Sequence, residues 1–219
     1  MKPSRSELGF ASLVAYCPRK GVSAAIDASQ RLMVQVKENR VLDVRGHEMT
    51  TAEYVALRLE EIAPTFTSTL LGKESALVPV PRSSLQKTGA LWPAKELAVA
   101  LHARGFGADV LPCLKREVAV PKAATSAARD RPKARTHCDS LTVLKPFELP
   151  SSVTLIDDVI TRGAQLLGAA WAIWTVRPDV VVRAFAVIRT VSDPAGFTAI
   201  ASPSEGVVTL RGEDTFRSP

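Results

Sequence analysis

The sequence has few cysteines, few aromatic residues and no long apolar run. Its three cysteines, Cys17, Cys113 and Cys138, are isolated, and no CxxC pair occurs, so neither a disulfide framework nor a zinc site is indicated. The first ten residues lack the apolar stretch of a signal peptide. No window approaches the roughly 18 apolar residues of a membrane span. We therefore expect a protein of the reducing cytoplasm with no membrane partner.

What the chain does contain is an ordinary globular composition with a concentrated basic segment. It has 219 residues, of which 46% are hydrophobic and 23% are charged, enough for one well-buried domain. Most of the net charge of +6 comes from residues 115–135, where seven Lys or Arg face two acids. Such a segment attracts nucleic acid or a phosphorylated small molecule, or it is a solvated basic loop.

The apolar pattern predicts an α/β domain. Strands that are apolar through their centres alternate with helices, which indicates a parallel sheet covered on both faces. Segment 115–139 has no sustained period and is predicted to be an exposed, mobile loop. The tail after Asp193 is weakly patterned. The expected strands are 12–17, 31–37, 76–81, 108–114, 152–157 and 179–190, and the expected helices are 50–62, 92–104 and 163–176.

The stretch VTLIDDVITRGAQL, residues 153–166, carries the clearest chemistry. Asp157 and Asp158 end an apolar strand, and a short loop then leads into a helix. Free N–H groups at a helix N-terminus bind phosphate, and Gly163 permits close backbone approach. The Thr161 hydroxyl adds a donor, and the two carboxylates can accept hydrogen bonds from a sugar diol. The pattern therefore suggests a ribose 5-phosphate site, the alternative being a solvated strand end.

The same residues carry a resemblance to a known family. DDVITRGAQ, preceded by VTLI, resembles the phosphoribosyl pyrophosphate (PRPP) signature of the type I phosphoribosyltransferases. The resemblance implies that Asp157 and Asp158 are the catalytic pair, holding the ribose 2′- and 3′-hydroxyls. It also implies a parallel-sheet core over residues 76–190, a small hood from residues 1–50, the tail or both, and a homodimer of single-domain chains. The 5′-phosphate would be surrounded by Thr161, Arg162, Gly163, Ala164 and Gln165.

Two further segments fit the family pattern. VPVPRSS followed by a helix is similar to the pyrophosphate-binding loop, which places that function on Arg82, Ser83 and Ser84, although a polar turn would look the same. Segment 115–139 has the place, length and charge of the flexible loop that closes over the reaction centre in family members. Its candidate cations are Lys122, Arg129 and Arg131. Mg²⁺ is the expected cofactor, bound mainly through PRPP.

The layout is especially similar to competence-protein-F-type members of the family. Those often carry an N-terminal zinc-binding cysteine cluster, and here Cys17 stands alone, so that module is missing. In members acting on 6-oxopurines an aspartate occupies the position of Thr161, which puts hypoxanthine or guanine activity in doubt. The sequence does not identify the acceptor nitrogen.

Three functions therefore remain open. The first is a glycosyltransferase of nucleotide metabolism that moves ribose 5-phosphate from PRPP to a nitrogen acceptor and releases pyrophosphate. The second is a non-catalytic PRPP- or nucleotide-binding protein, or a DNA-processing accessory, on the same fold. Two Tyr, three Trp and seven Phe give the nucleic-acid version little support from base stacking. The third is a structural protein whose aspartates only end a strand.

Overall fold

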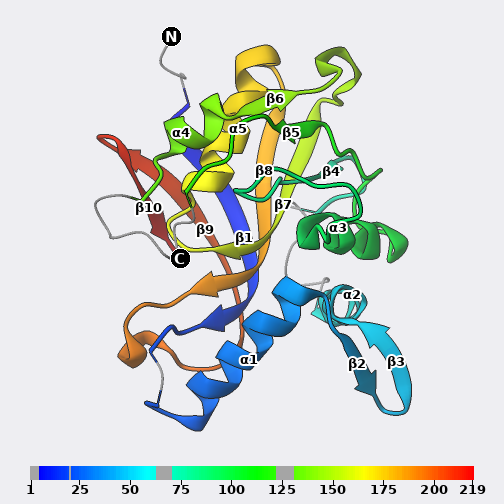
Figure 1. The fold of residues 1–219 in the computed structure, drawn as a ribbon, viewed down its shortest axis with the longest axis vertical. Helices are drawn as coiled ribbons and strands as arrows, with labels where there is room; N and C mark the ends of the chain where they lie inside the picture. Colours follow the sequence, from blue (N-terminus) through cyan, green and yellow to red (C-terminus); the bar gives the residue numbers. More distant parts are fainter. Residues whose placement is uncertain (1–4, 20, 63–70, 122–130) are drawn as a thin grey trace.

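A six-stranded, mostly parallel sheet forms the centre of the molecule (Figure 1), in the order β10-β9-β1-β8-β7-β4. The computed structural model describes residues 5–19, 21–62, 71–121 and 131–219. The parallel strands are β1 (Glu7–Tyr16), β4 (Ala76–Pro79), β7 (Ser152–Ile160) and β8 (Val181–Thr190). The antiparallel strands β9 (Ala201–Arg211) and β10 (Asp214–Ser218) complete the edge beside β1.

Helices cover both faces of this sheet. Along β7, Val153 and Leu155 enter the core beneath α5 (Ala164–Val176), whereas Ile156 enters the core beneath α2 (Thr51–Ile62) and α3 (Pro93–Ala103). This alternation is the period of two that a strand imposes on its side chains. The α5 helix is apolar on nearly all of its faces, which fits the burial of all its residues from 166 to 174. The prediction of a mixed α/β domain with a mainly parallel, helix-flanked sheet is confirmed.

Local signals placed α2 and α3 correctly. Thr50 and Glu53 form a capping box: the Thr50 N–H donates to Glu53 Oε2 at 2.6 Å, and the Glu53 N–H donates to Thr50 Oγ1 at 3.3 Å. Pro93 occupies the first turn of α3, and Gly105, with φ of +80°, follows its end. Among the helices of the described residues, none combines the length and hydropathy that a membrane crossing needs.

Two expected strands are wrong. Residues 31–37 belong to the helix α1 (Ala24–Glu38), which Ser23 caps and Asn39 ends in a left-handed conformation. Its inward-facing residues Ile26, Ser29 and Val36 follow a helical spacing that a shorter window hides. Residues 108–113 form no strand beyond one bridge, between Val110 and Leu77, and Leu114 begins a separate short strand.

The edges of the basic segment are ordered, so the expectation of a loop over 115–139 is wrong there. Its first residues belong to β5 (Leu114–Arg116), which pairs with β6 (Leu141–Val143). Its last residues form α4 (Ala134–Asp139), which packs on α5. Lys122 and Arg129 lie outside the described residues.

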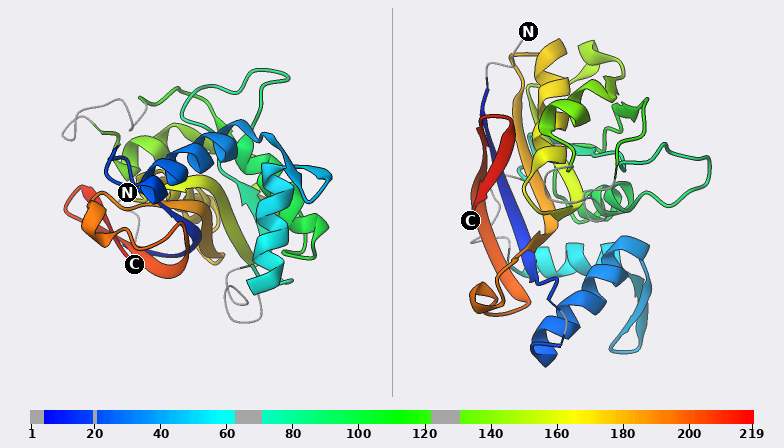
Figure 2. Two further views of the ribbon diagram at one scale, coloured as in Figure 1. Left: turned by 90° about the horizontal axis from the view of Figure 1, so that it is seen from below. Right: turned by 60° about the vertical axis from the view of Figure 1, so that its left-hand side comes forward.

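The N-terminal 50 residues divide between the sheet and the region predicted to form a hood. β1 lies inside the sheet between β8 and β9, so residues 7–16 are part of the core and not of an outlying cap. α1 and the hairpin of β2 (Val41–Val44) and β3 (His47–Thr50) lie together at the lower end of the molecule in Figure 1 and in the right-hand view of Figure 2. This is the end at which β1 and β8 finish.

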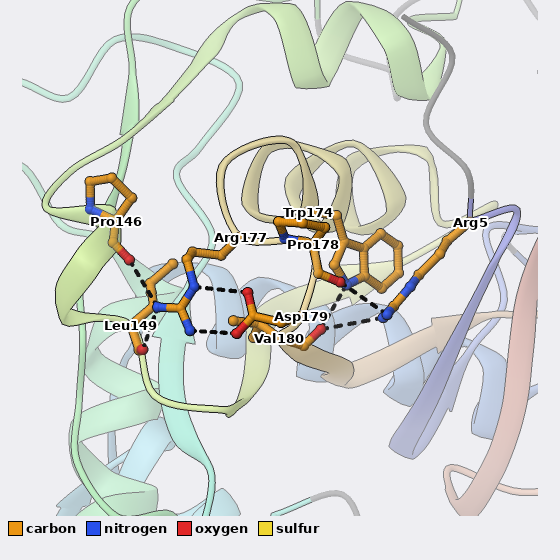
Figure 3. A network of polar contacts seen from close by, with 8 residues as sticks. All are labelled: Arg5, Pro146, Leu149, Trp174, Arg177, Pro178, Asp179 and Val180. Carbon is orange, nitrogen blue, oxygen red and sulfur yellow. Dashed lines mark hydrogen bonds and ion pairs between the residues drawn. The ribbon is translucent and has the colours of Figure 1, made fainter.

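The opposite end is fixed by polar contacts around the turn between α5 and β8 (Figure 3). Arg177 Nη1 donates to the Leu149 carbonyl at 3.0 Å, and its guanidinium pairs with Asp179 at 2.6 Å. Trp174 Nε1 and Arg5 Nη1 both donate to the Val180 carbonyl, at 3.0 and 3.3 Å. In these contacts side chains bind backbone carbonyls of neighbouring segments. Ligands of α/β proteins bind at the other end of the sheet, beyond the carboxyl ends of the strands.

Candidate functional site

The acid pair does not end β7 but lies within the strand, just before its last two residues. The strand continues to Ile160, beyond the expected end at residue 157, so successive side chains project to opposite faces. Asp157 lies on the α5 side, where its Oδ2 accepts from Gln165 Nε2 at 3.1 Å. Its Oδ1 accepts from the Asp158 N–H at 2.9 Å, and the residue is only 5% exposed.

Asp158 faces the other side, towards α1. Its Oδ2 lies 3.8 Å from Lys37 Nζ, and its side chain is 23% exposed. A void of about 10 Å³ adjoins it, lined also by Asn39 and Pro93, which is room for one water molecule. The two carboxyl groups thus have different partners, Gln165 on α5 and Lys37 on α1, while they also interact directly with each other.

Burial perturbs Asp157 strongly. Loss of solvent raises its pKa well above the usual value, repulsion from Asp158 raises it further, and Lys37 opposes the shift only weakly. A buried carboxyl group with a perturbed pKa at the ligand-binding end of a sheet is typical of a functional position.

We expect Asp157→Asn to stabilise the folded protein at pH 7 by about 1 kcal/mol, or roughly 2–4 °C in Tm. A carboxyl group whose pKa is higher in the folded than in the unfolded chain destabilises the fold as pH rises from about 3.9 through the raised value. The advantage of the variant should therefore grow from pH 4 to pH 7, measured by thermal unfolding across that range.

The exposed Asp43 supplies the matched control, because its Oδ1 also accepts a backbone N–H, that of Gly46, at 2.8 Å. Asp43→Asn should leave Tm nearly unchanged. A less stable Asp157→Asn protein at pH 7 would mean that the ionised carboxylate is a structural hydrogen-bond acceptor. The raised pKa of Asp157 would then no longer indicate a functional position.

The loop after β7 has the form of an anion cradle. Gly163 is the N-cap of α5 with φ of +84° and provides no side-chain cap, so the N–H groups of the first turn are free for a ligand. Ala164 and Gln165 begin the helix, and Arg162 is exposed. A Cβ on residue 163 would lie 2.4 Å from Val208 Cγ2, so both the conformation and the close approach of β9 require glycine.

The C-terminal hairpin supports this loop. Arg217 Nε donates to the Thr161 carbonyl at 2.9 Å, and its Nη2 donates to the Thr190 carbonyl at 2.7 Å. The two threonine hydroxyls lie 3.2 Å apart. The tail, which the sequence left weakly patterned, thus forms part of the site.

The structure brings the predicted pyrophosphate loop beside Asp157. Pro79 pairs with Ile156 across the sheet, and the Val80 N–H donates to the Ile156 carbonyl at 2.9 Å. The loop that follows has Arg82 and Ser84 exposed and Ser83 half-buried. It is not a free turn, since the Val120 N–H donates to the Ser83 carbonyl at 2.8 Å.

Arg116 is a residue of this site that sequence reasoning missed. It is 4% exposed and donates to the carbonyls of Pro81 and Arg82 at 3.2 and 2.8 Å, and to Ser140 Oγ. Burial lowers its pKa to about 10, while the charge of Asp157 opposes that shift. In the sequence Arg116 is one of seven cations in a basic segment, and its burial follows from the pairing of β5 with β6, which no local signal shows.

The described residues suit a magnesium ion that is held weakly, and they do not form a magnesium site made of protein ligands alone. The carboxylates of Asp157 and Asp158 are the hard oxygen ligands that Mg²⁺ prefers, but Gln165 and Lys37 already contact them. Within the described ranges no group of three or more His, Cys, Asp or Glu side chains could hold a metal. An ion here would depend on ligand and water oxygens.

The acid pair, the α5 N-terminus and residues 82–84 therefore lie together at the carboxyl end of the parallel strands. Arg131 lines a cavity together with Thr161 and Arg162. Scans against models of known protein families and against curated proteins find no match for this chain.

Proposed function

We propose that the protein is a PRPP-dependent phosphoribosyltransferase that transfers ribose 5-phosphate to a nitrogen acceptor and releases pyrophosphate. The observation that carries the proposal is the order of parts at the end of β7. An acid pair is followed directly by a glycine-capped helix N-terminus, and a second polar loop lies alongside through the pairing of Pro79 with Ile156.

Each part has a separate task in that reaction. The N–H groups at the start of α5, with Thr161 and Arg162, would bind the 5′-phosphate. Asp157 or Asp158 would accept from a ribose hydroxyl, and Arg82 would stabilise charge on the departing pyrophosphate. Bound magnesium would add positive charge to the pyrophosphate and orient it. Catalysis would come from positioning and charge stabilisation without a covalent nucleophile.

Binding of magnesium PRPP should stabilise the fold. At a ligand concentration 100 times the dissociation constant, the expected gain is about 2.7 kcal/mol, which thermal unfolding would detect as roughly 5–10 °C. The double variant Asp157→Asn with Asp158→Asn should remove most of this gain, since it cannot offer charged acceptors to the diol. Each variant is compared with its own ligand-free Tm, because Asp157→Asn alone changes stability.

Ribose 5-phosphate and pyrophosphate, added separately, serve as controls and should give smaller shifts than PRPP. If millimolar PRPP with Mg²⁺ leaves the Tm unchanged, the proposal fails.

A second candidate is a PRPP- or nucleotide-binding protein without transferase chemistry. It is favoured by the contacts of the two carboxyl groups, since Asp157 already accepts from Gln165 and Asp158 lies beside Lys37. Measuring pyrophosphate release over a panel of nucleobases and ammonia separates the two. PRPP-dependent stabilisation with no release against any acceptor would favour the binding protein.

A further inference from the structure

A cavity of about 730 Å³ lies between the end of β8, the loop after β7 and the β9–β10 hairpin. Its volume is in the range of small-molecule sites. Neither of the aspartates on β7 nor the loop 82–84 contributes to its lining. The cavity is distinguished by its arginines: Arg131, Arg162, Arg189, Arg211 and Arg217.

Within the described residues these five cations are not held in ion pairs, although the charge of Arg162 helps to lower the pKa of Asp214. None of them has a carboxylate within ion-pairing distance there. The lining also holds Asp193 and Asp214, but both are engaged: Asp193 Oδ1 accepts from the Ala195 N–H at 3.0 Å, and Asp214 pairs with Lys133. The cavity therefore has an excess of positive charge.

Two of the guanidinium groups also have unused hydrogen-bonding capacity. The Nε atoms of Arg131 and Arg189 are buried without a partner, although burying a donor unpaired costs about 1–3 kcal/mol. Arg189 uses Nη2 on Ser202 Oγ at 2.6 Å. Burial lowers the pKa of Arg217, and repulsion from Arg189 lowers it further. An anion between these side chains would relieve both the repulsion and the missing hydrogen bonds.

An exposed aromatic ring stands at the same cavity. Phe216, on β10, is 46% exposed, and the guanidinium of Arg211 lies 3.9 Å from its ring centroid. A stacked arginine of this kind keeps its N–H edge free for phosphate. The ring adds an apolar surface next to the cations.

We propose that this arginine cavity is a second binding site, for a small molecule with an oligophosphate chain. Five guanidinium forks exceed what one phosphate group satisfies, and planar bidentate donors match phosphate oxygens. The cavity volume is that of a small-molecule site, which favours a small molecule over a nucleic-acid strand. The site shares Thr161 and Arg162 with the predicted 5′-phosphate loop, whereas its other four arginines lie outside that loop, so it does not rest on the proposed transferase function.

Tripolyphosphate is the probe, titrated by calorimetry into the full chain without Mg²⁺. We expect binding that weakens roughly tenfold in Arg189→Gln and again in Arg211→Gln, since each removes a charge-assisted hydrogen-bonding group. Arg45→Gln is the matched control: it removes one exposed arginine of the β2–β3 hairpin, outside the cavity, and should leave binding unchanged. Thermal unfolding checks that each variant is folded.

A crossed comparison separates this site from the PRPP site. The double variant at Asp157 and Asp158 should bind tripolyphosphate like the unaltered protein while losing the PRPP-induced stabilisation. Arg211→Gln should weaken tripolyphosphate binding while keeping the PRPP-induced stabilisation. No tripolyphosphate binding at millimolar concentration, or equal binding by the unaltered chain and both arginine variants, overturns the proposal. Single-stranded DNA binding that the arginine variants weaken, with tripolyphosphate failing to compete, would also overturn it in favour of a nucleic-acid surface.

Discussion

Replacing Arg116 with methionine is expected to lower the free energy of unfolding by about 4 kcal/mol. The side chain is buried, and its guanidinium holds the carbonyls of Pro81 and Arg82 together with Ser140 Oγ. Methionine fills a similar volume but leaves the buried Pro81 carbonyl, the half-buried Arg82 carbonyl and the buried Ser140 hydroxyl without this donor, at about 1–3 kcal/mol for each buried group. The substitution also removes a positive charge that interacts favourably with the charge of Asp157. Urea denaturation at a constant m-value measures the loss.

The same substitution should act on ligand binding, because Arg116 fixes the backbone that leads into the predicted pyrophosphate loop. Arg116→Lys is the matched control, since lysine keeps the charge but cannot reach three acceptors with a planar fork. We expect Lys to lose about half as much stability as Met, and both to weaken the PRPP-induced shift in Tm. A methionine variant as stable as the unaltered protein would show that the buried charge costs as much as its hydrogen bonds return.

The sequence predicted the central part of the fold because those elements carry local signals. The capping box of Thr50 and Glu53, the Pro93 start of α3 and the apolar centres of β7 and β8 each fix an element without knowledge of its neighbours. The order of strand, acids, glycine loop and helix could likewise be seen in a single stretch. Local patterns of this kind survive because tertiary packing reinforces them.

The missed parts depend on distant partners. β9 shows only weak alternation of buried and exposed residues, and it forms a strand because β1 and β10 supply its hydrogen bonds. Arg116 looks like any other cation in a basic segment until Pro81, Arg82 and Ser140 surround it. The arginine cavity is lined by residues 131, 162, 189, 211 and 217. These residues lie too far apart in the sequence to form a recognisable motif.

Enlarging Gly168 should be more damaging still. A Cβ on this residue of α5 would lie 2.5 Å from the Ala134 carbonyl oxygen and 2.6 Å from the His137 Cβ, both on α4. Backbone cannot yield as a flexible side chain does, so Gly168→Leu must separate the two helices, and we expect a loss above about 4 kcal/mol. Gly168→Ala should lose about 2 kcal/mol, after a gain of about 1 kcal/mol from helix propensity.

Gly9→Ala in β1 is the control, since a Cβ there meets nothing within 4 Å, and its stability should change by less than about 0.5 kcal/mol. His137 supplies a local readout. Burial lowers its pKa to about 4, with a further contribution from Arg116. If α4 separates from α5 in Gly168→Ala, solvent reaches the ring, and an NMR titration should find its pKa closer to 6.5.

That readout connects helix packing to the candidate site, because the carbonyl of His137 accepts from Ser140 Oγ at 2.7 Å and the same hydroxyl accepts from Arg116. A displaced α4 therefore loosens Arg116 and, through it, the backbone of residues 81–82. Gly168→Ala should weaken PRPP-induced stabilisation although it touches no predicted ligand contact. An unchanged His137 pKa together with full stability would mean that α4 and α5 tolerate a methyl group between them, and that this path to the site does not exist.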